Sequence, residues 1–162
     1  MSDRTMLQFD YEVVDGKVVT AVLGFSDVLL GWESIAIVTS EGALLIRVDQ
    51  DTDELMVNLE PAPDEGKLWH PVPDLASAVG LKLGWCWVGR NYRGYLDMFT
   101  VSFSDLDPQV CFIGEASQIR IKQIVTASRH ESAFAKNQFV VRTTQKLAIN
   151  AAQSVLKSGR TR

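Results

Sequence analysis

The chain has 162 residues, of which 46% are hydrophobic and 22% are charged. This composition suits one globular domain with a sizeable core and excludes wholesale disorder. No apolar run approaches the roughly 20 residues that span a bilayer, and the acidic start MSDRTMLQFDYE does not resemble a signal peptide. We therefore expect a cytoplasmic protein without membrane contact.

The net charge of −4 is distributed unevenly along the chain. Residues 129–162 hold seven cations and one anion, whereas residues 1–128 hold nine cations and 19 anions. The sequence therefore predicts an acidic β-rich domain at 1–128 and a basic C-terminal extension at 129–162. The extension either lies on its own acidic domain, which we favour, or meets an acidic partner.

Alternation of apolar and polar residues, punctuated by turn residues, predicts antiparallel strands over most of the first 125 residues. A hairpin is expected around Asp15-Gly16, because both positions suit the positive φ of a tight turn. A second hairpin is expected around Glu41-Gly42. The acidic turn DQDTDE then leads into LMVNL, a third strand of that meander.

The segment 60–80 holds four of the five prolines and is therefore a connection. We expect it to be strapped over the sheet, anchored by Leu68 and Trp69, with a short helix at 74–79. The strand pattern then resumes in LKLGWCWV, YLDMFTVSFS, QVCFIGE and SQIRIKQIV. Three glycines in these runs mark positions for bulges or close backbone approach: Gly84, Gly89 and Gly114.

Residues 143–159 (TTQKLAINAAQSVLKSG) place apolar side chains three and four positions apart, which predicts an amphipathic helix. Its narrow, alanine-rich stripe suits packing against the sheet or pairing with a second copy in a homodimer. We favour the sheet, because an uncovered apolar face invites aggregation. The expected fold class is α+β: a mostly antiparallel meandering β-sheet with a C-terminal amphipathic helix packed on it.

The stretch GWCWVGRNYRGYLDMF predicts an aromatic hairpin with a polar tip. Strand alternation puts Trp85 and Trp87 on one face. A symmetric loop places Trp87 opposite Met98. A slip by one residue places Trp87 opposite Phe99 and gathers the large rings on one side of the hairpin. We favour this register because it buries more aromatic surface. The tryptophans are then inside and the tip outside.

Two guanidiniums and a ring at the tip suit a partner surface, since Tyr, Trp and Arg dominate interface energetics. They would also suit stacking on nucleic acid, but the acidic domain that carries them repels a phosphate backbone. The candidate residues for contact with a partner or ligand are Trp87, Arg90, Asn91, Tyr92, Arg93, Tyr95 and Asp97.

The sequence offers no metal site or cofactor motif. Cys86 and Cys111 have no second ligand at zinc spacing and lie in apolar runs typical of buried free thiols. The acidic stretch 49–60 matches the spacing of a calcium loop at Asp49, Asp51, Asp53 and Glu60. It has Glu54 where the loop needs glycine, so we expect its acids to solvate a hairpin turn instead of binding calcium.

No catalytic residues are predicted. Cys86 or a serine could in principle pair with His70 or His130, but no nucleophile elbow, phosphate-binding glycine loop or dinucleotide motif accompanies them. The chain is therefore read as non-enzymatic.

Four motifs follow one another between residues 13 and 127: an acidic DxDT turn, a proline-bearing link with a Trp, a hairpin of the form W-x-W, N-x-x-G-Y-x-D, and an apolar strand after Ala-Ser. They read here as DQDTDELMV, PAPDEGKLW, GWCWVGRNYRGYLD and GEASQIRIKQI. In this order they resemble a family of small bacterial proteins of unknown function. The resemblance implies a compact β-rich domain and no known activity.

The sequence favours a non-enzymatic binding or regulatory protein with a protein partner, for which an immunity-type inhibitor of a basic toxin fits the acidic charge. The alternative is a small-molecule-binding or hydrolytic domain with a pocket at Trp85, Trp87, Asn91 and Asp97. Concavity discriminates between them, because a pocket requires these polar groups to converge.

Overall fold

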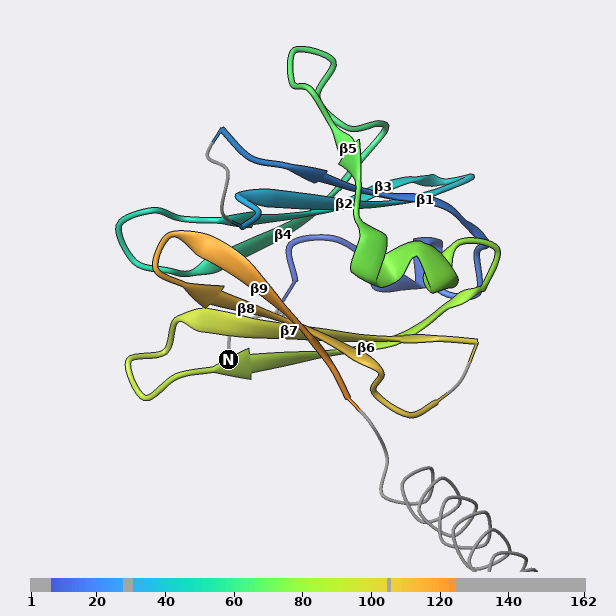
Figure 1. Ribbon diagram of the computed structural model, residues 1–162. Coiled ribbons are helices and arrows are strands. Elements are labelled where there is room, and N and C mark those ends of the chain that lie inside the picture. The colour runs from blue at the N-terminus through green and yellow to red at the C-terminus, as the bar shows by residue number, and fades with distance from the viewer. Residues whose placement is uncertain (1–6, 28–30, 105, 125–162) are drawn as a thin grey trace, which may run out of the picture. The chain divides into compact units, whose positions relative to one another are not determined.

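The computed structural model describes residues 7–27, 31–104 and 106–124, which form two antiparallel sheets (Figure 1). The first sheet has the order β4-β3-β2-β1-β5 and comprises β1 (Val19–Phe25), β2 (Ser34–Thr39), β3 (Gly42–Val48), β4 (Leu55–Glu60) and β5 (His70–Pro71). The second has the order β6-β7-β8-β9 and comprises β6 (Leu83–Arg90), β7 (Leu96–Phe103), β8 (Val110–Glu115) and β9 (Gln118–Gln123). Two short 3-10 helices complete the described elements, η1 (Tyr11–Val13) and η2 (Pro73–Ala78).

The prediction of an α+β fold with one meandering sheet is wrong. The described residues form two sheets, and their only helical elements are η1 and η2. The chain changes sheets in the proline-bearing link 61–82, which adds only the two-residue β5 to the first sheet before β6 opens the second. The predicted helix at 143–159 and the basic extension at 129–162 lie outside the described residues. No helix in the described ranges is long and apolar enough to cross a membrane.

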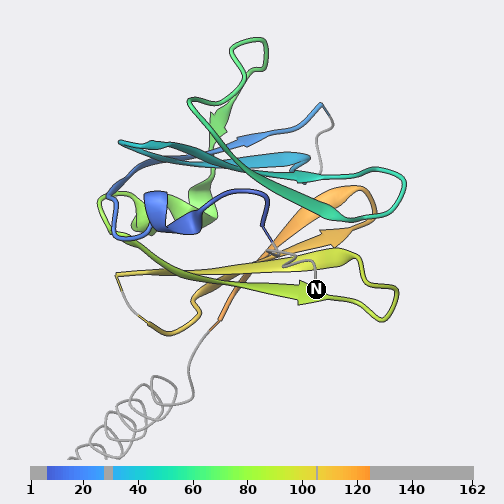
Figure 2. The same ribbon diagram turned by 180° about the vertical axis from the view of Figure 1, so that it is seen from behind.

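The two sheets enclose a shared hydrophobic core, and Figures 1 and 2 show them as two layers. Alternation along each strand sends one set of side chains between the layers. The fully buried members include Ile35, Ile37, Leu44 and Ile46 from the first sheet and Phe99, Val101, Phe112 and Ile119 from the second. Phe99 lies opposite Phe112 in the β7–β8 ladder.

The predicted N-terminal hairpin around Asp15-Gly16 does not form. Gly16 does adopt a positive φ of 73°, but the residues before it make η1, whose N-cap is Asp10. Asp10 accepts a hydrogen bond from the Glu12 amide at 3.0 Å, and a cap of this kind competes with extended backbone. Tyr11 then packs against the shared core, and its hydroxyl donates to the Gly84 carbonyl oxygen at 2.9 Å.

The hairpin around Glu41-Gly42 is confirmed as β2 and β3, and β4 follows as predicted. The proline-bearing link was predicted to be anchored over the sheet by Leu68 and Trp69. This prediction is correct for Trp69 and wrong for Leu68. The Trp69 ring packs on the small outer cluster of the first sheet (Ala36, Ala43 and Leu45), whereas Leu68 is 73% exposed. The predicted short helix corresponds to η2.

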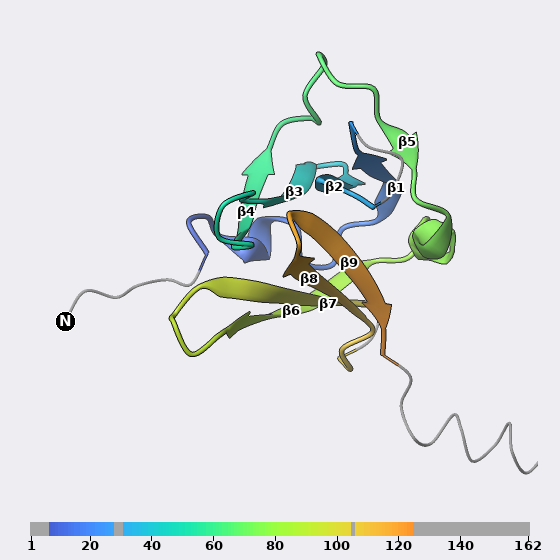
Figure 3. The same cartoon turned by 60° about the vertical axis from the view of Figure 1, so that its left-hand side comes forward.

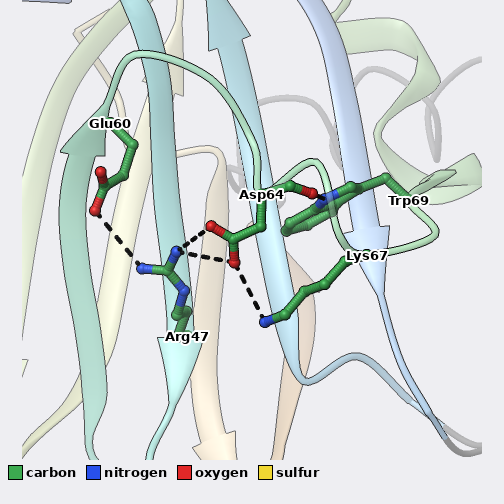
Figure 4. A network of polar contacts seen from close by, with 5 residues as sticks. All are labelled: Arg47, Glu60, Asp64, Lys67 and Trp69. Atoms are coloured by element: carbon green, nitrogen blue, oxygen red, sulfur yellow. Dashed lines mark hydrogen bonds and ion pairs between the residues drawn. The ribbon is translucent and has the colours of Figure 1, made fainter.

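A polar network fastens this strap to the outer side of the first sheet (Figure 4). Arg47 lies between Glu60 and Asp64, with nitrogen–oxygen distances of 4.0 and 3.4 Å. Lys67 reaches the same Asp64 carboxylate at 3.4 Å, and the Trp69 indole N–H donates to the Asp64 carbonyl oxygen at 3.0 Å. Exposed ion pairs contribute about 0–1 kcal/mol each, so the half-buried Trp69 ring is the main anchor.

The two sheets also meet through backbone contacts at their margins (Figure 3). Val18 bridges Lys82 and Trp32 bridges Ile119, where the Ile119 amide donates to the Trp32 carbonyl oxygen at 2.6 Å. The β3–β4 turn reaches the β8–β9 turn as well, because the Asp53 carboxylate accepts a hydrogen bond from the Ser117 amide at 2.6 Å. The first sheet is thereby fixed to the second at several places besides the core.

Candidate functional site

The β6–β7 hairpin carries all the predicted contact residues, and two bulges decide which way they face. At the two ends of the hairpin, Arg90 pairs with Leu96 and Leu83 pairs with Phe103. If this register continued through the hairpin, Trp87 would lie opposite Phe99, as predicted. Between these ends, however, the register shifts. The structure pairs Trp87 with Thr100 instead, so both predicted partners of Trp87 are wrong.

The shift has two sources. Asp97 is an extra residue on β7 near the tip, and Gly84 and Trp85 together lie opposite the single residue Ser102 on β7. Because a bulge inserts one residue into one strand only, the segment between the two bulges presents its other face. Cys86 and Val88 therefore pack against the core.

Trp85 and Trp87 consequently lie on the outer face of the second sheet, which contradicts the prediction that they are inside. Trp85 is 56% exposed and Trp87 is half-buried. Met98 is 41% exposed and shares this face with Ile113, its partner on β8. We call Trp85, Trp87, Met98 and Ile113 the aromatic face. The sequence prediction of a bulge position at Gly84 is confirmed. The aromatic face was nevertheless missed, because the strand alternation was continued through Gly84 and no residue indicated the second bulge at Asp97.

The hairpin tip is held in one backbone conformation by its own side chains. The Asn91 side-chain oxygen accepts hydrogen bonds from the amides of Arg93 and Tyr95 at 2.9 and 3.3 Å. Gly94 has a φ of 87°, which favours glycine, and the Arg90 guanidinium donates to its carbonyl oxygen at 2.7 Å. The motif residues Asn91 and Gly94 therefore shape the turn.

Tyr92 and Arg93 project from this turn as a preformed pair. Tyr92 is 91% exposed. The Arg93 Nε donates to the Tyr92 hydroxyl at 2.9 Å, and its guanidinium carbon lies 5.5 Å from the ring centroid. This is a cation–π arrangement in which each side chain restrains the other. Tyr95 and Asp97 are half-buried at the base of the tip.

Two clefts formed by described residues are lined by residues other than the predicted pocket residues. A cleft of about 600 Å³ lies on the opposite side of β6 from Trp85 and is lined by Leu7, Gln8, Phe9, Asp10, Tyr11, Cys86 and Val88. A second cleft of about 290 Å³ lies beside β4 and is lined by Leu7, Gln8, Glu54, Leu55, Met56, Val57, Asn58, Arg90 and Leu96. Neither includes Trp85, Trp87, Asn91 or Asp97.

The acidic turn between β3 and β4 uses its carboxylates to hold backbone. Asp49 accepts hydrogen bonds from the amides of Asp51 and Thr52 and from the Thr52 hydroxyl, at 2.9 to 3.1 Å. These bonds lower the pKa of Asp49, with the Asp51 amide as the largest cause. Glu54 accepts from the Leu96 amide at 3.2 Å. The described residues contain no group of three or more potential metal ligands.

Cys86 is the thiol nearest a cleft, and its surroundings keep it protonated. Burial, with a smaller contribution from the charge of Asp15, raises its pKa to about 11. Burial likewise raises the pKa of the neighbouring Tyr11, with smaller contributions from Cys86 and Asp15. His70 lies on β5 in the other sheet. The other predicted base, His130, lies outside the described residues. A protonated thiol is a poor nucleophile.

We expect Cys86 to react slowly with thiol reagents at pH 8. Its thiolate fraction there is about 100-fold below that of a thiol with the reference pKa of 9.0, because the pKa is about 11. The labelling rate of the Cys111→Ser variant should rise continuously up to about pH 11, as followed by mass spectrometry. A rate that levels off near pH 8 to 9 would contradict this assignment.

Comparison with known proteins identifies the family. A family model described as "Family of unknown function (DUF6334)" matches residues 1–128. A search of curated proteins and a search of solved structures each give no match. The predicted membership in a family of unknown function is confirmed, and the chain belongs to the family DUF6334 through residues 1–128.

Proposed function

We propose that this protein acts by binding a protein partner without catalysing a reaction, and that the β6–β7 hairpin makes the contact. The observation that carries the proposal is the Tyr92–Arg93 pair, in which a 91% exposed ring is restrained by a neighbouring guanidinium on a fixed turn. A large side chain held ready in this way loses little conformational entropy on binding. Tyr and Arg are also the residues most enriched at interface hot spots.

The aromatic face extends the same surface along the hairpin. Trp85 and Met98 leave apolar area exposed beside the tip, and such area is costly to leave in water unless a partner covers it. The tip and three of the four residues of the aromatic face belong to the β6–β7 hairpin, and Ile113 lies beside them on β8. A partner could therefore contact both at once.

Charge favours a basic partner. The described residues between 7 and 82, which include the first sheet, carry 14 anions and four cations. An acidic surface steers basic proteins to it and raises their association rate. The toxin of a toxin–immunity pair belongs to this class, and an immunity-type role is part of the proposal.

The test is affinity capture from the native host, with the wild type compared with Tyr92→Ala and Arg93→Ala. We expect both variants to retain about tenfold less of a specific partner, because hot-spot truncations cost more than about 1 kcal/mol. Leu68→Ala is the matched control, since Leu68 is 73% exposed on the strap of the other sheet. Equal recovery of every captured protein by all four forms would refute the proposal.

A further inference from the structure

The strand β4 ends the first sheet, and only β3 lies beside it among the described residues. The Asp49 amide donates to the Glu54 carbonyl oxygen at 2.8 Å. This bond shows which residue pairs between β3 and β4 are hydrogen-bonded to each other. Hydrogen-bonded and non-hydrogen-bonded positions alternate in an antiparallel pair. The backbone groups that point away from β3 therefore belong to Leu55, Val57 and Leu59.

The other three edge strands in the described part of the chain carry features that discourage pairing. β5 has two residues and includes Pro71. β6 contains a register shift at each end. β9 carries Arg120 and Lys122 and is bridged at Ile119 by Trp32. Short length, proline, bulges and cations are the usual protections of a sheet edge.

β4 has none of these features. Its sequence LMVNLE contains no Gly, Pro, Lys or Arg, and its register with β3 is unbroken from Leu55 to Glu60. A regular edge of this length with a β-branched residue at its centre is a template for another strand. The acids at its two ends are the one property that restricts what can pair with it.

There is room beside this edge. The 290 Å³ cleft is lined by the five consecutive residues 54–58 together with Leu7, Gln8, Arg90 and Leu96. Consecutive residues of a strand point to opposite faces of the sheet. A cleft that touches all five therefore runs along the backbone edge of β4.

The charge around β4 selects the occupant. Residues 49–65 contain seven carboxylates and no Lys or Arg: Asp49, Asp51, Asp53, Glu54, Glu60, Asp64 and Glu65. Three cations lie near them, because Arg47 pairs with Glu60 and Asp64, Lys67 pairs with Asp64, and Arg90 lines the cleft. The carboxylates therefore outnumber these cations by four. A second copy of β4 paired antiparallel to the first would bring Glu54 of one chain near Glu60 of the other, and like charges facing each other across strands repel. A strand that carries cations would instead meet opposite charges.

We propose that the free edge of β4 takes up an extended, Lys- or Arg-bearing segment of a partner protein as an additional strand. The backbone groups of Leu55, Val57 and Leu59 supply the hydrogen bonds, and the surrounding carboxylates select the basic segment. Strand addition to an exposed edge is an established mode of peptide recognition. This surface belongs to the first sheet and is distinct from the β6–β7 hairpin, so its test does not depend on the hairpin's role.

The test uses a synthetic peptide of about eight residues, the length of an ordinary strand, that alternates lysine with valine and threonine and has capped ends. Amide hydrogen exchange is followed by NMR on the full chain. In the free protein the amides of Met56, Asn58 and Glu60 should exchange slowly and those of Leu55, Val57 and Leu59 quickly. The peptide should slow the second group about tenfold or more when bound in excess. The same peptide with glutamate in place of lysine should have no such effect.

Variants at Asn58 separate strand addition from general attraction to an acidic protein. Asn58 lines the cleft and is half-buried on β4. Asn58→Lys should weaken lysine-peptide binding about tenfold, because a cation on the edge repels the basic strand. Asn58→Gln is the matched control and should bind as the wild type does. Tyr92→Ala should also bind normally, which keeps this result independent of the hairpin proposal.

Three outcomes would overturn the proposal. The Leu55, Val57 and Leu59 amides could remain fast-exchanging in the presence of the lysine peptide. The glutamate peptide could bind equally well, which would remove the charge argument. Light scattering at two protein concentrations could show a dimer. If the three amides are already protected in that dimer and Asn58→Lys restores the monomer, the occupant is a second copy of the chain.

Discussion

Replacement of Phe99 by alanine is expected to lower the free energy of unfolding by about 3–5 kcal/mol. Phe99 is fully buried between the sheets, with Val88 beside it on β6 and Phe112 beside it on β8. Truncation removes a ring from water-free surroundings and leaves a cavity that strands from two sheets cannot easily close. Urea denaturation followed by tryptophan fluorescence measures the loss.

Met98→Ala is the matched control for Phe99→Ala. Met98 is the adjacent residue on β7 but faces outward, where it is 41% exposed. We expect it to cost less than about 1.5 kcal/mol, because a partly exposed side chain loses only part of its transfer free energy. If Phe99→Ala and Met98→Ala lowered the free energy of unfolding equally, the assignment of the two faces of β7 would be wrong. The register of the hairpin would then be wrong as well.

Replacement of Gly114 by alanine is expected to destabilise the protein by about 1–3 kcal/mol, the usual cost of forcing atoms into a packed site. A Cβ on Gly114 would overlap the Asp53 carbonyl oxygen, and it would also approach a side-chain carbon of Leu55 at 3.4 Å. The obstacle is backbone, so it cannot move aside by changing rotamer. The β3–β4 turn must shift away from the second sheet, and thermal unfolding should report the loss as a lower melting temperature.

Gly66→Ala supplies the comparison for Gly114→Ala. Nothing lies within 4 Å of a Cβ built on Gly66, and its φ is not in the left-handed region. A neutral or slightly stabilising effect is expected there, because alanine reduces the entropy of the unfolded chain. If Gly114→Ala were as harmless as Gly66→Ala, the close approach between the β3–β4 turn and β8 would be wrong.

Local signals in the sequence predicted the parts of the fold that depend on local interactions. Glu41-Gly42 specified the β2–β3 turn, and the bonds that Asp49 accepts explain why DQDTDE could be recognised as a turn before β4. The four strands of the second sheet were also correct as segments. Their assignment to a separate sheet was missed, because alternation says which residues are buried but not what they are buried against.

The errors occurred where distant residues override a local preference. Asp15-Gly16 has hairpin chemistry, yet Tyr11 gains burial and a hydrogen bond to Gly84 when the preceding segment crosses to β6. The exposed tip at Tyr92 and Arg93 was predictable from turn residues. The outward position of Trp85 was missed. Gly84 was one of three glycines that marked candidate bulges, but the packing of the whole sheet decides which of them interrupts the alternation.

The bridges that join the two sheets have a consequence for how the chain folds. Val18 meets Lys82 and Trp32 meets Ile119, so each bridge closes a loop that contains several complete strands. The β2–β3 and β8–β9 hairpins can form early, whereas loop-closure entropy delays contacts between distant residues. Synthesis by the ribosome must reach β9 before the Trp32 bridge can close, and until then the nascent first sheet exposes the apolar side that the second sheet covers in the native state.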